Sequence, residues 1–250
     1  MVARATPPQL ETIAAESPKY TAPLLFVHGL WCTAACWRRV MGYLAHRGWT
    51  SHALQLPSRD GADLSLAALA QHVQCAMAAC AAAPVVIGHD LGGRLALTTT
   101  GARAVVALAP LTNAAHVRLV TAGWRTRLQL LRAAPVPPPR GLLGRQLFAG
   151  PSPQPQIRES AQLLRALRRA PDVPPAVVPS LIVAGAHDRF CPPADAAALA
   201  LRIGATLQVA PDAGHALPWE PDWERRAAKM HSWIVRTLGE TLLALLDAPD

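Results

Sequence analysis

The sequence lacks any long uninterrupted run of apolar residues. A helix that spans a membrane needs at least about 18 of them in succession, and no such stretch is present. Residues 1–20 also lack the apolar segment that characterises a secretory signal peptide. We therefore expect a cytoplasmic protein with no membrane partner.

Cysteine is scarce, and its spacing excludes two kinds of site. The five cysteines are an odd number, and neither they nor the histidines follow the spacing of zinc ligands. A glycine loop that cradles phosphate and is followed by lysine is missing as well. These absences predict buried free thiols, no metal and no bound cofactor.

Acidic residues are rare in one segment of a chain whose formal net charge is +8. Residues 111–178 contain ten arginines but only two acidic residues, Glu159 and Asp172. A GC-rich genome explains why arginine outnumbers lysine 22 to 2, but not why the excess lies in one segment. A basic surface over a pocket would attract a small-molecule substrate that is anionic or carrier-bound. Motifs that read nucleic-acid grooves are missing, so we expect no nucleic-acid partner.

Short apolar runs alternate with helical patterns, which is typical of a mostly parallel sheet flanked by helices. We predict strands at 23–29, 52–56, 84–89, 104–109, 180–184 and 206–210. We predict helices at 35–47, 64–82, 91–100, 114–133, 157–170, 194–202 and 222–246. The arginine-rich segment 111–178, with prolines in its middle, interrupts the alternation. It predicts a small helical cap inserted into a core formed by residues 1–110 and 179–250.

The most specific motif is GHDLGG at residues 88–93, directly after a predicted strand and directly before a predicted helix. Its general form is G-x-nucleophile-x-G. A strand-to-helix turn this tight strains the backbone of its central residue and leaves room only for small neighbours, hence Gly88 and Gly92. The turn exposes the central side chain at the top of the sheet, beside a helix N-terminus. The motif therefore predicts that Asp90 is the reactive group.

Three further motifs follow other strands, and with the elbow they resemble the α/β-hydrolase superfamily over nearly the whole chain. The HGLW segment stands where that family has its oxyanion loop, GAHD where it has its acid, and the GH pair after the last strand where it has its histidine. The order nucleophile, acid, histidine is that of the fold. The resemblance implies the α/β-hydrolase fold and a triad of Asp90, Asp188 and His215. It also implies an oxyanion hole formed by the backbone N–H groups of Leu30 and Leu91.

An aspartate in the elbow distinguishes the chain from the serine members of that superfamily. The GHD elbow resembles those of epoxide hydrolases, haloalkane dehalogenases and haloacetate dehalogenases. A carboxylate needs no deprotonation, because its unperturbed pKa is about 3.9, and it can attack an sp³ carbon to form an alkyl-enzyme ester. The resemblance implies that His215, oriented by Asp188, activates the water that hydrolyses this ester. It therefore implies cleavage of an epoxide C–O bond or a C–halogen bond.

Other positions depart from these relatives. Leu91 stands where haloalkane dehalogenases and most epoxide hydrolases have tryptophan, and Leu30 where dehalogenases have an asparagine that holds the halide. Epoxide hydrolases use cap tyrosines, but neither Tyr20 nor Tyr43 lies in the predicted cap. The loop 28–37 instead resembles small esterases and hydroxynitrile lyases, which use serine.

Two other classes of function therefore stay open. One is an esterase- or thioesterase-like enzyme, or a non-hydrolytic lyase or cyclase, that acts on acyl or polyketide substrates. The other is a catalytically silent binding protein. In these, Asp90 would serve as a general base or would hydrogen-bond His215 rather than act as the nucleophile.

Several side chains near the motifs are candidates for contacting the substrate: His28, Trp31, His89, Arg94 and Trp124. Arg94 lies one helical turn beyond Asp90, where it could bind a substrate carboxylate or pair with a neighbour on its helix. The two tryptophans could line the pocket or pack in the ordinary way. The two histidines could instead pack beside the oxyanion loop and the elbow.

Overall fold

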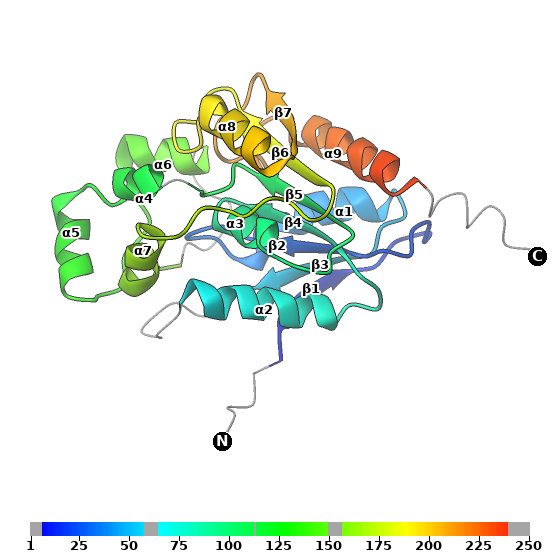
Figure 1. Ribbon diagram of the computed structural model, residues 1–250, viewed down its shortest axis with the longest axis horizontal. Helices are drawn as coiled ribbons and strands as arrows, with labels where there is room; N and C mark the ends of the chain where they lie inside the picture. The colour runs from blue at the N-terminus through cyan, green and yellow to red at the C-terminus, as the bar shows by residue number, and fades with distance from the viewer. Residues whose placement is uncertain (1–6, 58–64, 113, 150–156, 240–250) are drawn as a thin grey trace, which may run out of the picture.

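The computed structural model describes residues 7–57, 65–112, 114–149 and 157–239. At its centre lies a seven-stranded sheet in the order β1-β3-β2-β4-β5-β6-β7, which crosses the middle of Figure 1. Its strand pairs are parallel except for β1 and β3, which are antiparallel. This confirms the predicted mostly parallel sheet. The strands are β1 (Gln9–Ile13), β2 (Leu24–Val27), β3 (Ser51–Gln55), β4 (Val85–His89), β5 (Ala104–Leu108), β6 (Ser180–Gly185) and β7 (Thr206–Ala210).

The four central strands are buried along their whole length. β2, β4, β5 and β6 read LLFV, VVIGH, AVVAL and SLIVAG, and every residue in them is buried. Continuous apolar runs of this kind suit parallel strands that are covered on both faces. β1 was not predicted, because its sequence QLETI is polar and only half buried at the edge of the sheet. Antiparallel pairing with β3 places β1 at this edge.

Helices cover both faces of the sheet. α1 (Arg38–Ala45) and α9 (Trp223–Thr237) pack against each other on one face, whereas α2 (Leu66–Ala78), α3 (Leu91–Leu97) and α8 (Pro193–Ile203) lie on the other (Figure 1). A short 3-10 turn, η1 (Ala34–Trp37), leads into α1. Each lies where a helix is predicted, and the last part of the predicted helix 222–246 falls outside the described residues.

Four short helices lie between β5 and β6 and gather at the left end of Figure 1. They are α4 (Ala114–Val120), α5 (Trp124–Leu131), α6 (Gly141–Phe148) and α7 (Ala161–Leu167). The single helix predicted at 114–133 is wrong, because the chain breaks between α4 and α5 and Gly123 caps α5 with a non-helical backbone. α6 was not predicted, because the prolines before it obscure its short apolar pattern. We call residues 111–178 the cap.

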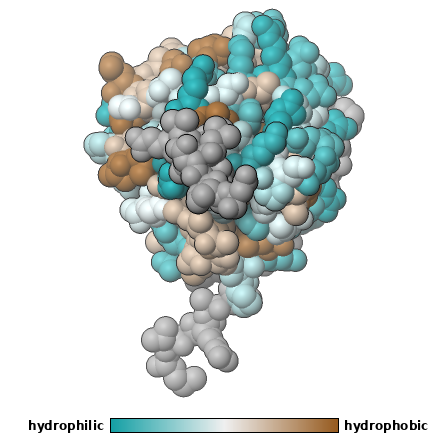
Figure 2. All heavy atoms as spheres, turned by 90° about the vertical axis from the view of Figure 1, so that its right-hand side faces the viewer, coloured by the Kyte–Doolittle hydropathy of each residue, from teal (hydrophilic) through white to brown (hydrophobic). Residues whose placement is uncertain are grey.

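The surface at the end remote from the cap carries both hydrophilic and apolar side chains. Figure 2 shows this end, where hydrophilic side chains cover much of the surface and smaller apolar areas lie between them. Within the described ranges, no helix has both the length and the apolarity needed to cross a bilayer.

Candidate active site

Asp90 occupies a strained turn between β4 and α3. Its backbone has φ 53° and ψ −116°, a conformation that residues other than glycine rarely adopt. Two backbone hydrogen bonds hold it there: the Asp90 N–H donates to the Leu108 carbonyl, and the Leu111 N–H donates to the Asp90 carbonyl, each at 3.0 Å. Such strain persists only where the surroundings enforce it. The geometry is that of the elbow predicted from the sequence.

The glycines on either side of Asp90 allow the turn to close. A Cβ atom on Gly88 would lie 2.1 Å from the carbonyl oxygen of Gly92. A Cβ atom on Gly92 would lie 2.1 Å from the carbonyl oxygen of Val27 in β2. Both neighbours are backbone atoms that cannot move aside, so the expectation of small residues at these two positions is confirmed.

One oxygen of the Asp90 carboxylate lies in the predicted oxyanion hole. Asp90 Oδ2 accepts a hydrogen bond from the Leu30 N–H at 2.7 Å, and the Leu91 N–H is a second donor to the carboxylate. Burial raises the pKa of Asp90; the charge of His215 and these two N–H groups oppose the rise but do not cancel it. The hole is therefore occupied by the side chain of the elbow itself.

His215 and Asp188 form a buried pair beside this carboxylate. The Nδ1 atom of His215 lies 2.9 Å from Oδ2 of Asp188. The other Asp188 oxygen accepts the N–H groups of Phe190 and Cys191 at 2.7 and 2.9 Å. Burial alone would raise the pKa of Asp188, but the charge of His215 and these hydrogen bonds hold it below its usual value.

The ionisation of His215 follows from the same pair. Burial by itself lowers the pKa of this imidazole, but the charge and hydrogen bond of Asp188, together with the charge of Asp90, raise it above its ordinary value. Its Nε2 atom faces Asp90 Oδ1 across 3.9 Å. This distance is too long for a hydrogen bond, whereas a base that deprotonates a nucleophile lies within about 3.2 Å of it.

Comparison with known proteins identifies the family of the chain. Residues 24–229 match the family described as the alpha/beta hydrolase family. The chain belongs to the alpha/beta hydrolase family. A search of curated proteins found no match to the sequence.

Solved structures of the same fold are distant in sequence. A monoacylglycerol lipase from Paleococcus ferrophilus superposes with a TM-score of 0.68 at 18% identity, covering 92% of this chain and 99% of the lipase. Est1E from Butyrivibrio proteoclasticus, with ferulic acid bound, has a TM-score of 0.68 at 12% identity over 93% and 96% of the two chains. MenH from S. aureus has a TM-score of 0.65 at 16% identity over 91% and 98%. At these identities the likeness shows the α/β-hydrolase fold alone.

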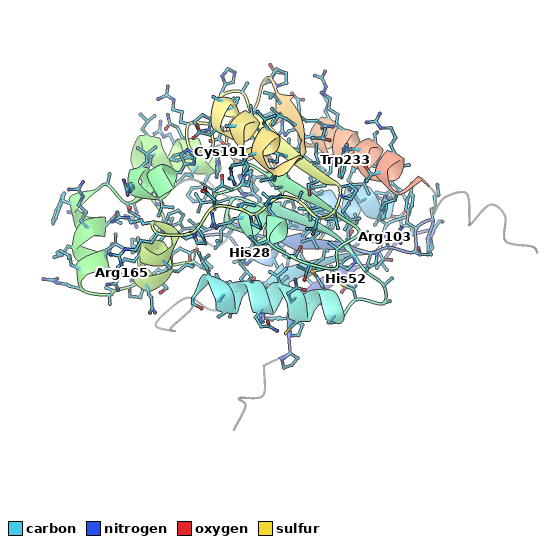
Figure 3. The ribbon with its side chains drawn as sticks, in the orientation of Figure 1. His28, His52, Arg103, Arg165, Cys191 and Trp233 are labelled. Atoms are coloured by element: carbon cyan, nitrogen blue, oxygen red, sulfur yellow. The ribbon has the colours of Figure 1, made fainter. Side chains whose placement is uncertain are left out.

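Two predicted substrate contacts, His28 and His89, hold backbone segments of the site in place. His28, near the centre of the molecule in Figure 3, is fully buried; its Nδ1 lies 3.0 Å from the Gly29 carbonyl, and its Nε2 accepts the Leu56 N–H at 3.2 Å. His89 Nε2 lies 2.8 Å from the carbonyl of His215. Burial and the nearby His215 lower the pKa of His89 to about 3, so it is neutral. These contacts favour the alternative in which both histidines pack beside the oxyanion loop and the elbow instead of contacting the substrate.

The structure argues against substrate contacts by Arg94 and Trp124. The Arg94 guanidinium is buried and donates to the carbonyl of Pro171, so it is held by the segment after α7. Trp124 begins α5 and is 70% exposed on the outside of the cap. Trp31 is buried and donates from Nε1 to the Val136 carbonyl at 3.2 Å, so it packs between the oxyanion loop and the cap.

Glu159 was not predicted as a functional residue, yet it contacts the oxyanion loop. It lies fully buried just before α7 and pairs through its backbone with Val136. Its Oε1 atom accepts the N–H of Trp31 at 2.5 Å. Trp31 has a strained φ of 57° and directly follows Leu30, whose N–H points at Asp90. The carboxylate therefore supports the loop that forms the oxyanion hole.

We expect Glu159→Gln to lower kcat by about tenfold, because a hydrogen bond to a charged group weakens when the charge is removed. KM should change little, since Glu159 positions the Leu30 N–H rather than the substrate. The kinetics of Glu159→Gln should be compared with those of Glu224→Gln, an exposed glutamate on α9. A lower melting temperature with unchanged kcat would show that Glu159 only anchors the cap.

Two more buried polar groups near the site were not predicted. Glu220 accepts the N–H groups of Gly214 and Ala216 at 2.7 and 2.9 Å, and so fixes the backbone on both sides of His215. His116, on α4, lies 3.2 Å from Asp195, and burial keeps its pKa below the ordinary value against the pull of that carboxylate. A sequence offers little signal for either, because their partners are loop backbone or a distant helix.

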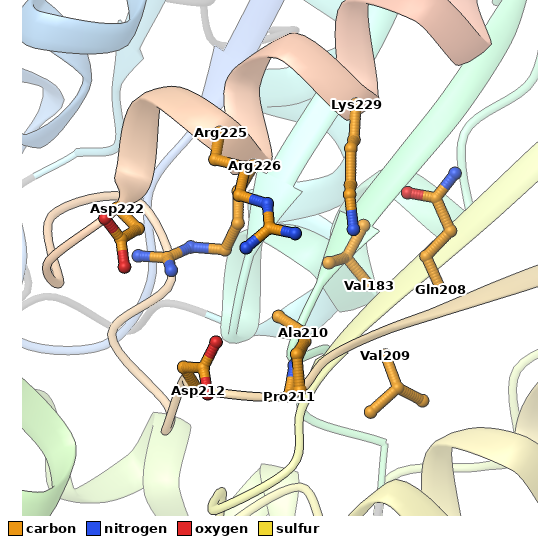
Figure 4. A pocket seen from close by; sticks show the side chains of 10 residues that line it. All are labelled: Val183, Gln208, Val209, Ala210, Pro211, Asp212, Asp222, Arg225, Arg226 and Lys229. Atoms are coloured by element: carbon orange, nitrogen blue, oxygen red, sulfur yellow. The ribbon is translucent and has the colours of Figure 1, made fainter.

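The cavity between β7 and α9 lies apart from this site. Among the described residues, no group of three histidine, cysteine or acidic side chains is arranged to hold a metal ion. A cavity of about 290 Å³ lies between β7 and α9, where Arg225, Arg226 and Lys229 approach it from the helix (Figure 4). The described residues that line it do not include any member of the Asp90, Asp188 and His215 group.

Proposed function

We propose that the protein is a hydrolase that opens the C–O bond of an epoxide, or alternatively a C–halogen bond, through an ester formed on Asp90. The observation that carries this proposal is the position of Asp90 Oδ2, which already accepts the Leu30 N–H in the oxyanion hole. In a serine member of the family, the hole must be empty to receive the carbonyl oxygen of the substrate. Here an oxygen of the nucleophile itself, Asp90 Oδ2, would carry the negative charge that the hole stabilises.

In the first step, Asp90 Oδ1 attacks an sp³ carbon of the substrate. The new C–O bond forms as the C–halogen or epoxide C–O bond breaks. A halide departs with the electron pair, whereas the oxygen of an opened epoxide stays attached to the substrate as an alkoxide and takes a proton from water. The strained elbow presents Oδ1 to the substrate, while the Leu30 N–H holds Oδ2. The 3.9 Å gap to His215 suits this step, because a carboxylate needs no base to remove a proton.

In the second step, His215 Nε2 takes a proton from a water molecule, and the hydroxide attacks the carboxyl carbon of the Asp90 ester. Asp188 stabilises the imidazolium through the 2.9 Å contact at Nδ1. The negative charge of the tetrahedral intermediate develops on Oδ2, where the Leu30 and Leu91 N–H groups stabilise it. Collapse releases the product alkoxide, which takes the proton from His215, and the Asp90 carboxyl group loses its own proton to solvent, so that the carboxylate is restored.

The placement of Arg94 bears on the class of substrate. A haloacid would need a cation for its carboxylate, and the guanidinium predicted for that task is bonded to the Pro171 carbonyl. This supports an uncharged substrate, and therefore an epoxide before a haloacid. The basic cap does not argue against this, because nine of its ten arginines are exposed and so are not held in a buried site.

Intact-mass spectrometry of His215→Ala, after incubation with a panel of epoxides, haloalkanes, haloacids and activated esters, tests the proposal. Without its base the second step stops, so the Asp90 ester should accumulate as an alkyl adduct that maps to the peptide containing Asp90. His187→Ala, an exposed histidine in the acid loop, is the matched control and should show no adduct. An acyl adduct formed from an ester would indicate the esterase-like alternative.

The active compound then allows a sharper test with labelled water. In a single turnover in H₂¹⁸O, the label should enter the Asp90 carboxylate and be absent from the first product. Label that enters the first product directly would mean that water, not Asp90, attacks the substrate. If neither the wild type nor His215→Ala reacts with any member of the panel, the binding-protein alternative gains support.

A further inference from the structure

The outer face of α5 carries a partly exposed apolar stripe, and the Arg125 guanidinium lies over the ring of its first member, Trp124, 5.2 Å from the ring centroid. Trp124, Leu128 and Leu131 are 70%, 37% and 81% exposed. At about 100° per residue, these three positions fall within an arc of roughly 60° on the helix surface. Leu130, only 5% exposed, lies on the side that packs into the cap. The helix is therefore anchored by one apolar side chain and presents three others to solvent.

Arginines flank this stripe on both sides. Arg127 lies about 40° from Leu131 around the helix, and Arg132 lies about 40° from Leu128 on the other side. Both guanidinium-bearing residues are exposed. Leu142 at the start of α6 is a further exposed apolar residue in the cap, at 71%. Apolar side chains bordered by arginines are typical of helices that lie in a lipid interface.

Few acidic residues lie near these arginines in the sequence. The sequence has no aspartate or glutamate between Asp90 and Glu159, and Glu159 is fully buried. Burial lowers the pKa of Arg168 on the inner side of the cap, and the charges of Arg118 and Arg127 lower it further. Guanidinium groups that repel one another in this way would be stabilised by an anionic partner.

A cavity of about 520 Å³ lies between α5, the proline run 137–139 and α6. Arg125, Arg140 and Arg158 line it, and none of the described residues in its wall is acidic. Arginine binds phosphate oxygens well, because its planar fork offers paired N–H donors. The cavity has the size and charge to receive a phosphate head group.

We propose that the cap binds the surface of an anionic phospholipid bilayer. Trp124, Leu128 and Leu131 enter the interface, the flanking arginines contact lipid phosphates, and the cavity between α5 and α6 takes one head group. The sequence predicted no membrane partner because it lacks a spanning segment, but a surface-bound helix needs none. The proposal does not depend on the chemistry of Asp90, and it can be tested without a substrate.

Co-sedimentation of the full chain with vesicles tests this inference. The protein should bind vesicles that contain phosphatidylglycerol and not vesicles of phosphatidylcholine alone, and added salt should weaken the binding. Trp124→Ser/Leu131→Ser should lose most of the binding, whereas Leu201→Ser, which changes an exposed leucine on α8, should keep it. Arg127→Gln/Arg132→Gln should lose about fivefold per arginine, and Arg225→Gln on α9 should lose none.

Fluorescence locates the contact. The chain has seven tryptophans, so the spectrum of Trp124→Phe is subtracted from that of the wild type, and the difference should shift to the blue on anionic vesicles. Binding that is equal on both kinds of vesicle, or that survives in the Trp124 and Leu131 double variant, would overturn the proposal. Failure to bind any vesicle, with binding to an acidic protein such as an acyl carrier, would overturn it as well. Circular dichroism of each variant excludes unfolding as the cause.

Discussion

Asp90→Asn should abolish turnover, lowering kcat by roughly 10⁴-fold or more, as loss of a nucleophile does in other enzymes. The amide has nearly the shape of the carboxylate and its oxygen can still accept the Leu30 N–H, so the elbow should keep its form. It lacks the negative charge and the available electron pair that attack carbon. No adduct should form in Asp90→Asn, nor in the double variant with His215→Ala, and both kcat and intact mass report the outcome.

The same variant should fold at least as stably as the wild type. Burial raises the pKa of Asp90, which means that its negative charge is costly in the folded state above that pKa. Asparagine removes this cost, so the melting temperature at neutral pH should not fall. Asp212→Asn, at an exposed position before His215, is the matched control and should leave kcat unchanged. Full activity in Asp90→Asn would contradict the nucleophilic role.

Asp188→Asn should lower kcat by about 10⁴-fold, the magnitude seen when a triad acid loses its charge. The contact between Asp188 Oδ2 and His215 Nδ1 selects the tautomer whose Nε2 can accept a proton from water. The first step does not use this pair, so the Asp90 ester should form normally and then persist. Intact mass would thus show an adduct in Asp188→Asn and none in Asp90→Asn.

The pH dependence of ester hydrolysis should change in Asp188→Asn. His215 must be neutral to accept a proton, so ester hydrolysis in the wild type should decline as pH falls through the pKa of His215, which the charge and hydrogen bond of Asp188 help raise. In Asp188→Asn that pKa should drop, so the slow residual hydrolysis should persist to lower pH. Single-turnover decay of the ester at a series of pH values measures this. Asp222→Asn, an exposed change before α9, should retain the wild-type profile; an identical profile in Asp188→Asn would contradict the assignment.

Several elements of the site were predictable because their chemistry depends on local sequence. The elbow needs a strand, two glycines and a helix in direct succession, and GHDLGG after a buried strand contains all three. The resemblance to the α/β-hydrolase superfamily implied the roles of Asp188 and His215, and parallel strands bring their carboxyl ends to one edge of the sheet. The buried pairing of these two residues and their approach to Asp90 agree with that expectation.

The supporting residues were harder to predict, because their roles depend on distant partners. Arg94 has the right helical spacing to face a substrate, but the carbonyl of Pro171, far along the chain, holds its guanidinium. Glu159 looks like one of two acids in a basic segment, and only the folded cap brings it to the Trp31 N–H. The predicted helix at 114–133 failed because the apolar pattern continues across Gly123 although the backbone does not.

The sequence by itself determined the α/β-hydrolase core, the elbow with Asp90 and the order of the reactive residues, because buried parallel strands and tight turns restrict which residues can occupy them. It also showed that the positive charge is concentrated in residues 111–178. Only the tertiary structure decided which apolar residues of that segment are buried. Leu130 and Leu131 are identical neighbours in the sequence, yet one packs into the cap and the other faces solvent, because consecutive side chains on a helix point about 100° apart.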